Sequence, residues 1–429
     1  MPSPFVSVVN LGCRVNRVES DRISTELARD GFALVSESDA DLVVINTCAV
    51  TGEAEAKTRK AVRHALSLPR HPIVLVTGCV VNLHPEELTD LSERVVAEPS
   101  KVDVPARVRD IMGDPLALVG APSSSCGPDL SELLGRSRLG IKIQDGCNHR
   151  CTYCIVWKAR GPERSVPVPH VLDQVREAES FGIPEVVLTG VNLGAYDGAD
   201  EGDAHVEIDE LLDRILEHTS IPHVRLSSIE PMDVSERLIE RMAASRDRVA
   251  PFLHLPIQSG CTETLRRMGR PYTAERLLEQ VGQIRAILPE VSLSCDVIVG
   301  FPGETDEEFE RSLDLCRQIG FSRMHVFRYS KRPGTIAATA PDQVDPAVMA
   351  ERSARMRSLA DEMARRDAAS RVGTIEGCVL EHGNRGTLAS FQRVVVDGVG
   401  EDATGLFVRV CLTGIEADGS LRGELVREG

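Results

Sequence analysis

Three cysteines near residue 150 are the first candidates for chemistry in this chain. Cys147, Cys151 and Cys154 form the pattern C-x3-C-x2-C, and no fourth cysteine follows nearby. A cubane four-iron cluster normally takes four thiolates, so three thiolates in one loop predict a cluster with one iron left open for a small molecule. A zinc site that uses Cys151 and Cys154 with Cys147 or His149 is the alternative, although structural zinc sites usually add a second ligand pair downstream. We therefore expect an iron–sulfur cluster here.

A second set of three cysteines is spread over the first eighty residues, and each member follows a predicted strand. The pairs are Cys13 after 5–9, Cys48 after 41–46 and Cys79 after 72–77. The loops at the carboxyl ends of the strands converge in an open α/β sheet, so we expect the three thiols to meet in one site. Three thiolates again predict a cluster with an open iron, which could hold an exogenous sulfur species. Three ordinary buried thiols are the alternative.

The rest of the chain supplies the elements that must position these cysteines. Strands and helices alternate over 1–112, which predicts a small α/β domain, and a Pro-, Gly- and Ser-rich stretch at 113–138 predicts a linker. Six β/α repeats over 139–344 predict a partial parallel barrel with its chemistry at the carboxyl ends of the strands. A connecting helix at 345–370 precedes short alternating strands over 371–429, which predict a small β-barrel. The expected fold class is α/β with this added β-barrel.

Polar residues and glycines follow the second, third and fourth strands of the predicted barrel. They are Gly190, Asn192, Glu230 and Gln258. Glycine lets the backbone approach a ligand, and the three polar side chains offer the hydrogen bonds that a ribose or an amino-acid moiety needs. We therefore expect these four residues to bind a cofactor. His254 is expected to be a hydrogen-bonded rim residue rather than a base, and Thr305 with Glu308 to form a helix capping box.

Composition limits the classes of protein to which the chain belongs. The net charge of -16 over 429 residues argues against a protein that coats nucleic acid indiscriminately. Seven Lys or Arg residues between Arg136 and Arg164 nevertheless surround the first triplet, either as a solvated loop or as a binding face. The amino terminus shows no signal peptide, and no apolar run is long enough to cross a bilayer. We expect a cytoplasmic protein without a membrane partner, whose 12 cysteines stay reduced.

Taken together, these motifs resemble the methylthiotransferase family of radical S-adenosylmethionine enzymes, whose last domain is called TRAM. Four segments are most similar to the branch that acts on threonylcarbamoyladenosine in the tRNA anticodon loop. They are LGCRVN at 11–16, GVNLGAY at 190–196, SSIEP at 227–231 and HVFRYSKRPGT at 325–335. Two positions near the first triplet depart from the family pattern. Trp157 stands where relatives typically have proline, and 164–166 lacks the usual second arginine.

The resemblance implies an enzyme that adds a methylthio group to carbon 2 of that nucleoside, a C–H bond too weakly acidic for a side-chain base. It implies two 4Fe-4S clusters, one on each triplet, with S-adenosylmethionine as radical source and methyl donor. The barrel cluster would make a 5'-deoxyadenosyl radical and the amino-terminal cluster would present sulfur. Tyr153 would flank the adenine of the cofactor, and Trp157 would offer a stacking surface for RNA.

The implied partners are tRNA, an electron donor such as a flavodoxin or ferredoxin, and a sulfur source. Two alternatives stay open. One is the same chemistry on another modified adenosine or on a protein side chain. The other is a non-enzymatic RNA-binding protein in which zinc replaces iron.

Overall fold

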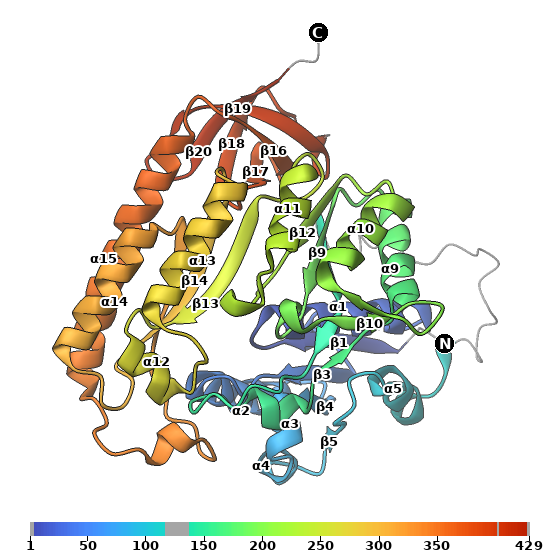
Figure 1. Cartoon of the computed structure of the whole chain (residues 1–429). Helices are drawn as coiled ribbons and strands as arrows, with labels where there is room; N and C mark the ends of the chain where they lie inside the picture. The colour runs from blue at the N-terminus through green and yellow to red at the C-terminus, as the bar shows by residue number, and fades with distance from the viewer. Residues whose placement is uncertain (1–3, 116–136, 401–402, 427–429) are drawn as a thin grey trace.

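The structure is a computed structural model that describes residues 4–115, 137–400 and 403–426 (Figure 1). Most of the predicted linker, 116–136, lies outside the described residues, and so does Arg136 of the basic patch. The domain boundaries expected from the sequence therefore stay predictions. Within the described residues, an amino-terminal sheet, a central partial barrel and a small terminal barrel follow one another along the chain.

The amino-terminal part is an open parallel sheet with the strand order β2-β1-β3-β4-β5. Its strands are β1 (Phe5–Asn10), β2 (Ala33–Leu34), β3 (Leu42–Thr47), β4 (Ile73–Gly78) and β5 (Val95–Ala97). All six residues of the central strand β3 are buried, as expected for a parallel strand covered on both faces. The helices are α1 (Arg14–Arg29), α2 (Gly52–Ser67), α3 (Cys79–Leu83), α4 (Glu86–Thr89) and α5 (Val104–Met112). The three strands expected before the cysteines are all present.

Six parallel strands form the central partial barrel. They are β6 (Arg138–Lys142), β9 (Glu185–Thr189), β12 (His223–Leu226), β13 (Phe252–Gln258), β14 (Ser292–Val299) and β15 (Arg323–Arg328). Strands β6, β9 and β12 pair in one group and β13, β14 and β15 in another, and the parallel bridge between Ser228 and His254 joins the groups. The edges of this sheet are therefore β6 and β15, as the partial barrel predicts.

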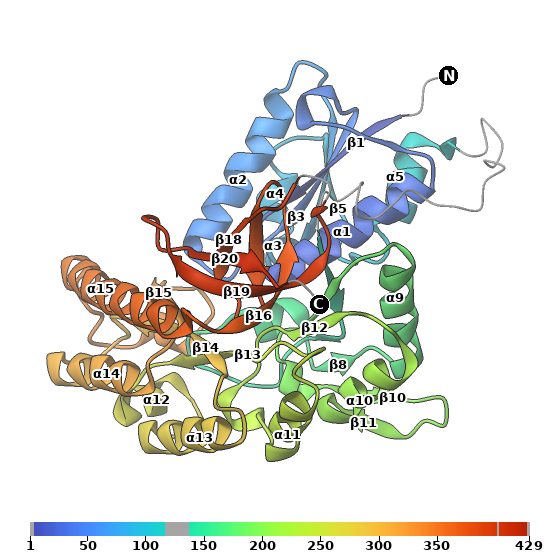
Figure 2. The same ribbon diagram turned by 90° about the horizontal axis from the view of Figure 1, so that it is seen from above.

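Helices cover the outside of the partial barrel (Figure 2). They include α9 (Val168–Ser180), α10 (Ile208–His218), α11 (Glu236–Ala244), α12 (Thr262–Met268), α13 (Ala274–Ile287) and α14 (Asp306–Ile319). Their apolar faces and the strands share one hydrophobic core. Helix α1 of the amino-terminal part packs closely along the edge strand β6. A Cβ atom added at Gly140 of β6 would lie only 2.3 Å from Cγ2 of Val18 on α1. The close approach requires a residue without a side chain at this position.

The long helix α15 (Pro346–Arg371) leads to a closed five-stranded barrel. Its strands are β16 (Ile375–Leu380), β17 (Arg385–Leu388), β18 (Arg393–Asp397), β19 (Phe407–Ile415) and β20 (Leu421–Leu425). The expected fold class is thus confirmed in all three parts. The terminal barrel lies at the amino-terminal ends of the central strands, and the amino-terminal sheet lies at the other side (Figure 1). No helix among the described residues is long and apolar enough to cross a membrane.

Candidate functional site

The loops after β1, β3 and β4 bring the three amino-terminal cysteines to one edge of the sheet. Cys13 precedes α1, Cys48 follows β3, and Cys79 opens α3. The first two loops touch, since a Cβ atom at Gly12 (φ +110°) would lie 2.3 Å from Cβ of Cys48. Burial and the nearby thiols of Cys13 and Cys79 raise the pKa of Cys48 to about 11. The strand-end triplet, Cys13, Cys48 and Cys79, is therefore one group of interacting thiols.

The loop triplet, Cys147, Cys151 and Cys154, follows β6 through the short strand β7 (Gln144–Asp145), which pairs with β8 (Arg164–Ser165). A tight turn starts the loop: a Cβ atom at Gly146 (φ +74°) would lie 1.9 Å from the Pro162 carbonyl oxygen. The amide of Cys154 donates to the Cys151 carbonyl at 3.1 Å. Burial, together with neighbouring thiols, raises the pKa of Cys147 to about 12 and of Cys154 to about 11.

The donor set of each triplet fits a metal cluster. All six thiols are free, and three thiols brought together in each loop group can bind a cationic group that stabilises them as thiolates. A zinc ion with Zn–S bonds of about 2.3 Å would hold its sulfurs roughly 3.8 Å apart. Among the described residues, three donors lie within 4.8 Å of one another only in two other groups, His254 with Asp296 and His325, and Cys261 with Glu263 and Glu308. The wider spacing of both triplets favours a multi-iron cluster over a single ion.

A buried polar network joins the two triplets. Asn16 of α1, three residues after Cys13, accepts a hydrogen bond of 2.6 Å from Arg160 of α8 (Val156–Arg160), six residues after Cys154. Arg160 also pairs with Glu19 at 3.0 Å and with Asp145 at 2.8 Å. The side chain of Asn82, just after Cys79, donates to the Ala159 carbonyl at 2.9 Å. These contacts fix the loop triplet against the sheet that carries the strand-end triplet.

This network also changes the interpretation of the basic patch. Lys142 pairs with Glu19 at 2.7 Å, and Arg164 pairs with Asp145 at 2.7 Å. Burial raises the pKa of the Glu19 carboxyl, but Arg160, Lys101 and Lys142 outweigh it and hold that pKa well below its usual range. Part of the patch is thus an internal ion-pair network rather than a solvated loop or a free phosphate-binding face. The sequence alone could not show this, because Glu19 lies far away along the chain.

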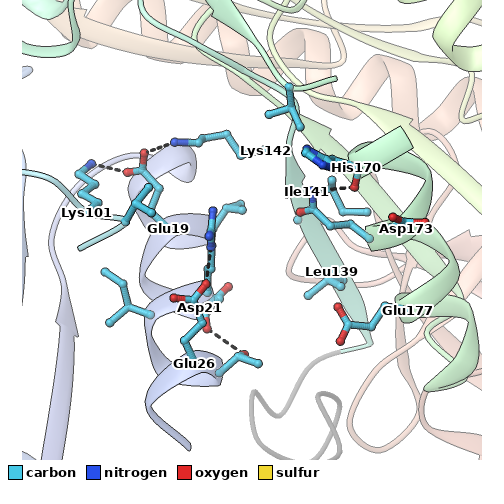
Figure 3. A pocket seen from close by; sticks show the side chains of 18 of the residues that line it. Glu19, Asp21, Glu26, Lys101, Leu139, Ile141, Lys142, His170, Asp173 and Glu177 are labelled. Atoms are coloured by element: carbon cyan, nitrogen blue, oxygen red, sulfur yellow. Dashed lines mark hydrogen bonds and ion pairs between the residues drawn. The ribbon is translucent and has the colours of Figure 1, made fainter. Parts of the chain in front are cut away.

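A cavity of about 510 Å³ opens beside this network, between α1 and the strand β6 with helix α9 (Figure 3). Glu19 reaches Lys101 and Lys142 at one end, and His170, Asp173 and Glu177 of α9 lie across from α1 (Figure 3). No cysteine of either triplet lines this cavity. It is therefore a crevice of the interface rather than part of the site.

The loops after β9 and β12 are held together by buried amides. The side-chain oxygen of Gln144 accepts from the amides of Val191 and Asn192 at 2.9 and 3.0 Å. The Asn192 side chain in turn accepts from the Glu230 amide at 3.2 Å and donates to Asp233 at 2.6 Å. At Gly190 an added Cβ atom would lie 3.0 Å from the Gln144 side chain. Gly190, Asn192 and Glu230, expected at one rim, do lie together, but the Asn192 amide is engaged within the protein.

Arg270 connects Glu230 to the loop triplet. Its guanidinium donates to Sγ of Cys151 at 3.4 Å, forms an ion pair with Glu230, and donates to the Tyr272 hydroxyl at 2.9 Å. Burial lowers the pKa of Arg270, but the charges of Tyr153 and Glu230 outweigh it and raise that pKa above its usual range. No sequence pattern set Arg270 apart, although a glycine, Gly269, stands directly before it and ends α12 with a left-handed backbone.

The remaining residues expected to contact the cofactor or RNA are Gln258, Tyr153 and Trp157. Gln258 ends β13 with a left-handed backbone (φ +64°) and is partly exposed. The ring of Tyr153 packs edge-on against Phe301, with centroids 6.4 Å apart, and burial raises its pKa. Trp157, expected as a stacking surface, already has the Arg150 guanidinium 3.9 Å from its ring centroid. One face of Trp157 is therefore occupied by the protein itself.

Three strands place a polar group on the inside of the partial barrel. His254 of β13 contacts Ser294 at 2.7 Å and Asp296 of β14 at 3.3 Å, and His325 of β15 contacts Asp296 at 3.1 Å. Burial raises the pKa of Asp296, but hydrogen bonds from both histidines outweigh it and lower that pKa well below its usual range. His254 is hydrogen-bonded, as its expected role requires.

Comparison with known proteins identifies the family. Residues 141–316 match the model of the Radical SAM superfamily, and residues 6–97 match that of Uncharacterized protein family UPF0004. The threonylcarbamoyladenosine tRNA methylthiotransferase MtaB of Bacillus subtilis (strain 168) is 33% identical over 424 residues, which cover 94% of this chain and 93% of that protein. This chain belongs to the methylthiotransferase family of radical S-adenosylmethionine enzymes. The family expected from the sequence is thereby confirmed.

Two further relatives of this methylthiotransferase cover most of both chains. The MtaB protein of Thermotoga maritima is 34% identical over 78% of this chain and 76% of that protein. The tRNA-2-methylthio-N(6)-dimethylallyladenosine synthase of Magnetococcus marinus is 32% identical over 87% of each. Among solved structures, the radical S-adenosylmethionine methyltransferase TsrM of Kitasatospora setae aligns with a TM-score of 0.55 at 17% identity, over 78% of this chain and 77% of that one. This likeness supports the fold alone.

Proposed function

We propose that this methylthiotransferase adds a methylthio group to carbon 2 of threonylcarbamoyladenosine next to the anticodon of tRNA. The observation that carries the proposal is the pair of cysteine triplets on loops joined through Asn16 and Arg160. A methylthiotransferase needs one site for the radical step and another for sulfur, and two such sites on adjoining loops meet that need. Relatives at 33 and 34% identity that carry the threonylcarbamoyladenosine name support the choice of nucleoside.

The proposed cluster ligands are Cys147, Cys151 and Cys154 for one 4Fe-4S cluster and Cys13, Cys48 and Cys79 for the other. When bound, these clusters and S-adenosylmethionine supply hydrogen-atom abstraction, sulfur and the methyl group. Tyr153, Gly190, Asn192, Glu230 and Gln258 are the residues proposed to contact S-adenosylmethionine.

The protein's own side chains hold these sites in place. The Arg270 cation lies 3.4 Å from Cys151 Sγ and favours the thiolate form of that ligand. The same guanidinium fixes Glu230, whose carboxylate can accept hydrogen bonds from the hydroxyl or amino groups of a cofactor. Gln144 and Asn192 hold the two adjoining loops in register. These residues position the reactants and exchange no proton with them.

The remaining partners follow from the chemistry. The reaction consumes electrons and a sulfur atom, so we propose a small electron-transfer protein such as a flavodoxin or ferredoxin, and a sulfur source, as further partners. We place the enzyme in the cytoplasm, where tRNA is found and where its thiols stay reduced.

Nucleoside mass spectrometry of tRNA tests the proposal. A strain that lacks this protein is expected to lose methylthiolated threonylcarbamoyladenosine and to retain methylthiolated dimethylallyladenosine. The wild-type gene restores the product, Cys151→Ala does not, and Cys411→Ser does, because Cys411 lies in the terminal barrel away from both triplets. Loss of the dimethylallyl product instead would assign the enzyme to the other nucleoside. An unchanged set of tRNA nucleosides would overturn the proposal and favour a protein substrate.

A further inference from the structure

Four guanidinium groups surround the ring of Phe391. The guanidinium carbons of Arg14, Arg138, Arg225 and Arg323 lie 5.7, 5.7, 5.0 and 5.6 Å from the ring centroid. Phe391 occupies the tip between β17 and β18 of the terminal barrel and has a left-handed backbone (φ +69°). A phenylalanine adopts this conformation only where its surroundings enforce it. The ring therefore marks a point where all three parts of the chain meet.

The tip is anchored by one of the four arginines. Arg225 donates to the carbonyl oxygens of Leu388 and Ala389 at 3.0 and 2.8 Å, and it pairs with Glu185 at 2.9 Å. Its side chain is only 1% exposed, so its charge is buried and fully compensated. Arg225 thus acts as a structural anchor and is not available to a ligand.

The other three arginines differ in how their charges are balanced. Arg138 pairs with Glu381 at 2.8 Å. Arg14 and Arg323 are exposed and form no ion pair within the part of the chain that the structure describes. Asp296 lies close enough to Arg14 for its negative charge to stabilise the guanidinium, but one of its oxygens already contacts His254 and His325. Two accessible cations beside one ring, with a nearby acid for Arg14 alone, make this an anion-binding arrangement.

The position of Arg14 relates this arrangement to the reaction. Arg14 directly follows Cys13, so their Cα atoms are about 3.8 Å apart. An adenine whose carbon 2 approaches the strand-end triplet would therefore lie beside the backbone from which the Arg14 side chain extends. The Phe391 ring of the terminal barrel lies beside the same guanidinium, with its centroid 5.7 Å from the guanidinium carbon of Arg14.

We infer that Arg14, with Arg323 beside it, binds the carboxylate of the threonine that the substrate nucleoside carries. The inference rests on the proposed function and names the part of the chain that selects the nucleoside. A guanidinium binds a carboxylate through two parallel hydrogen bonds, which the uncharged dimethylallyl group cannot form. An RNA phosphate offers the same chemistry, so the experiment must separate the two anions.

Three synthetic anticodon stem-loops that differ only at the modified adenosine provide the test. One carries threonylcarbamoyladenosine, the second carries its threonine methyl ester, and the third carries plain adenosine. Binding to the anaerobically reconstituted full-length enzyme is measured by fluorescence anisotropy. The wild type is expected to bind the first RNA at least about tenfold more tightly than the ester, as a charged hydrogen-bonded pair requires.

Arg14→Gln is expected to remove this preference and to leave binding of the ester and of plain adenosine within roughly twofold. Arg17→Gln is the matched control, because Arg17 is an exposed arginine one turn later on α1 that pairs with Asp21. It should keep the preference. Iron content and thermal unfolding, measured in parallel, establish that each variant is folded and loaded.

The outcomes separate the inference from the function on which it rests. Equal loss of affinity for all three RNAs on Arg14→Gln would assign the arginine to a phosphate and overturn the inference. A preference that survives in Arg14→Gln would also overturn it, while conversion of threonylcarbamoyladenosine by the wild type would leave the proposed function standing. Failure of the wild type to methylthiolate that RNA would instead contradict the proposed function itself.

Discussion

The two cysteine triplets reach adjoining positions by opposite routes. The loop triplet occupies eight consecutive residues, 147–154, and its shape is set by a tight turn at Gly146 and by local hydrogen bonds. The strand-end triplet draws on residues 13, 48 and 79, and it exists only when three parallel strands pair in the correct order. The ligands of the first site are close together in the sequence, whereas those of the second depend on the pairing of the whole sheet. The two sites should therefore be separable by mutation.

Loss of the loop triplet is expected to have the largest effect. The anaerobically reconstituted wild type should hold about eight irons per chain, as two four-iron clusters require, and the Cys147, Cys151, Cys154 triple alanine variant about four. Cleavage of S-adenosylmethionine should disappear, because the iron that chelates it is lost. Iron and zinc analysis together with 5'-deoxyadenosine measurement checks this. Substantial zinc with little iron in the wild type would contradict it.

Loss of the strand-end triplet is expected to stop methylthiolation but not the cleavage of S-adenosylmethionine. A Cys13, Cys48, Cys79 triple alanine variant should still form 5'-deoxyadenosine but no methylthiolated product, because the sulfur site is gone while the other cluster stays. Both products are measured on the same tRNA. Methylthiolated product from this variant would show that the three cysteines are structural. Loss of both products in a folded protein with its barrel cluster would show that the two sites cannot be separated.

The network that joins the triplets should contribute a smaller, pH-dependent stability. Glu19→Gln removes a buried charge that compensates Arg160, Lys101 and Lys142, and it should lower the free energy of unfolding by about 3 kcal/mol at pH 7. Because the folded pKa of Glu19 lies below its unfolded value of about 4.3, this stabilisation is complete above that pH. It is lost as the pH falls towards the folded pKa.

Urea unfolding followed by circular dichroism, at neutral pH and near pH 3, measures the effect of Glu19→Gln. The gap between wild type and variant should shrink at the lower pH. Glu177→Gln is the control, because its exposed ion pair with Arg29 also joins α1 to the central barrel. It should change stability by less than about 1 kcal/mol. A gap for Glu19→Gln that is the same at both pH values would rule out the charge as its source.

The smallest effect is expected far from both triplets. Thr305 and Glu308 form the expected capping box at the start of α14. Thr305→Ala should cost about 1 kcal/mol of stability, because one helix amide loses its acceptor, and Thr305→Ser should cost less. Neither change should alter the ratio of 5'-deoxyadenosine to methylthiolated product. A shift in that ratio would mean that the two sites sense the outer helices of the barrel.

Much of the fold could be predicted because its signals are local. Strand β3 is a run of apolar residues followed by a polar end, and all six of its residues are buried. The loop triplet was evident from spacing, and the strand-end triplet from the repeated order of strand and cysteine. The general rule that loops converge at the carboxyl ends of parallel strands then placed the three cysteines together.

What the sequence could not supply were contacts between residues far apart in the chain. Arg270 and Cys151 are 119 residues apart, and Arg160 and Glu19 are 141 residues apart. Arginines are common on surfaces, so neither had a pattern that set it apart. The pairing of Glu19 with Arg160 also explains why charge counting misjudged the basic patch. A run of positive residues says nothing about which acids the fold will bring to it.

The contacts between the central barrel and residues 388–391, at the tip between β17 and β18, have a consequence for experiments that shorten the chain. Arg225 is buried and relies on the Leu388 and Ala389 carbonyl oxygens, and the Phe252 and Phe391 rings lie 4.9 Å apart. A truncated protein that ends after α15 would leave a buried cation short of two acceptors and an aromatic ring facing water. Such a truncation should aggregate rather than yield a smaller enzyme with weaker affinity for RNA. Its inactivity would therefore carry no information about a detachable RNA-binding module.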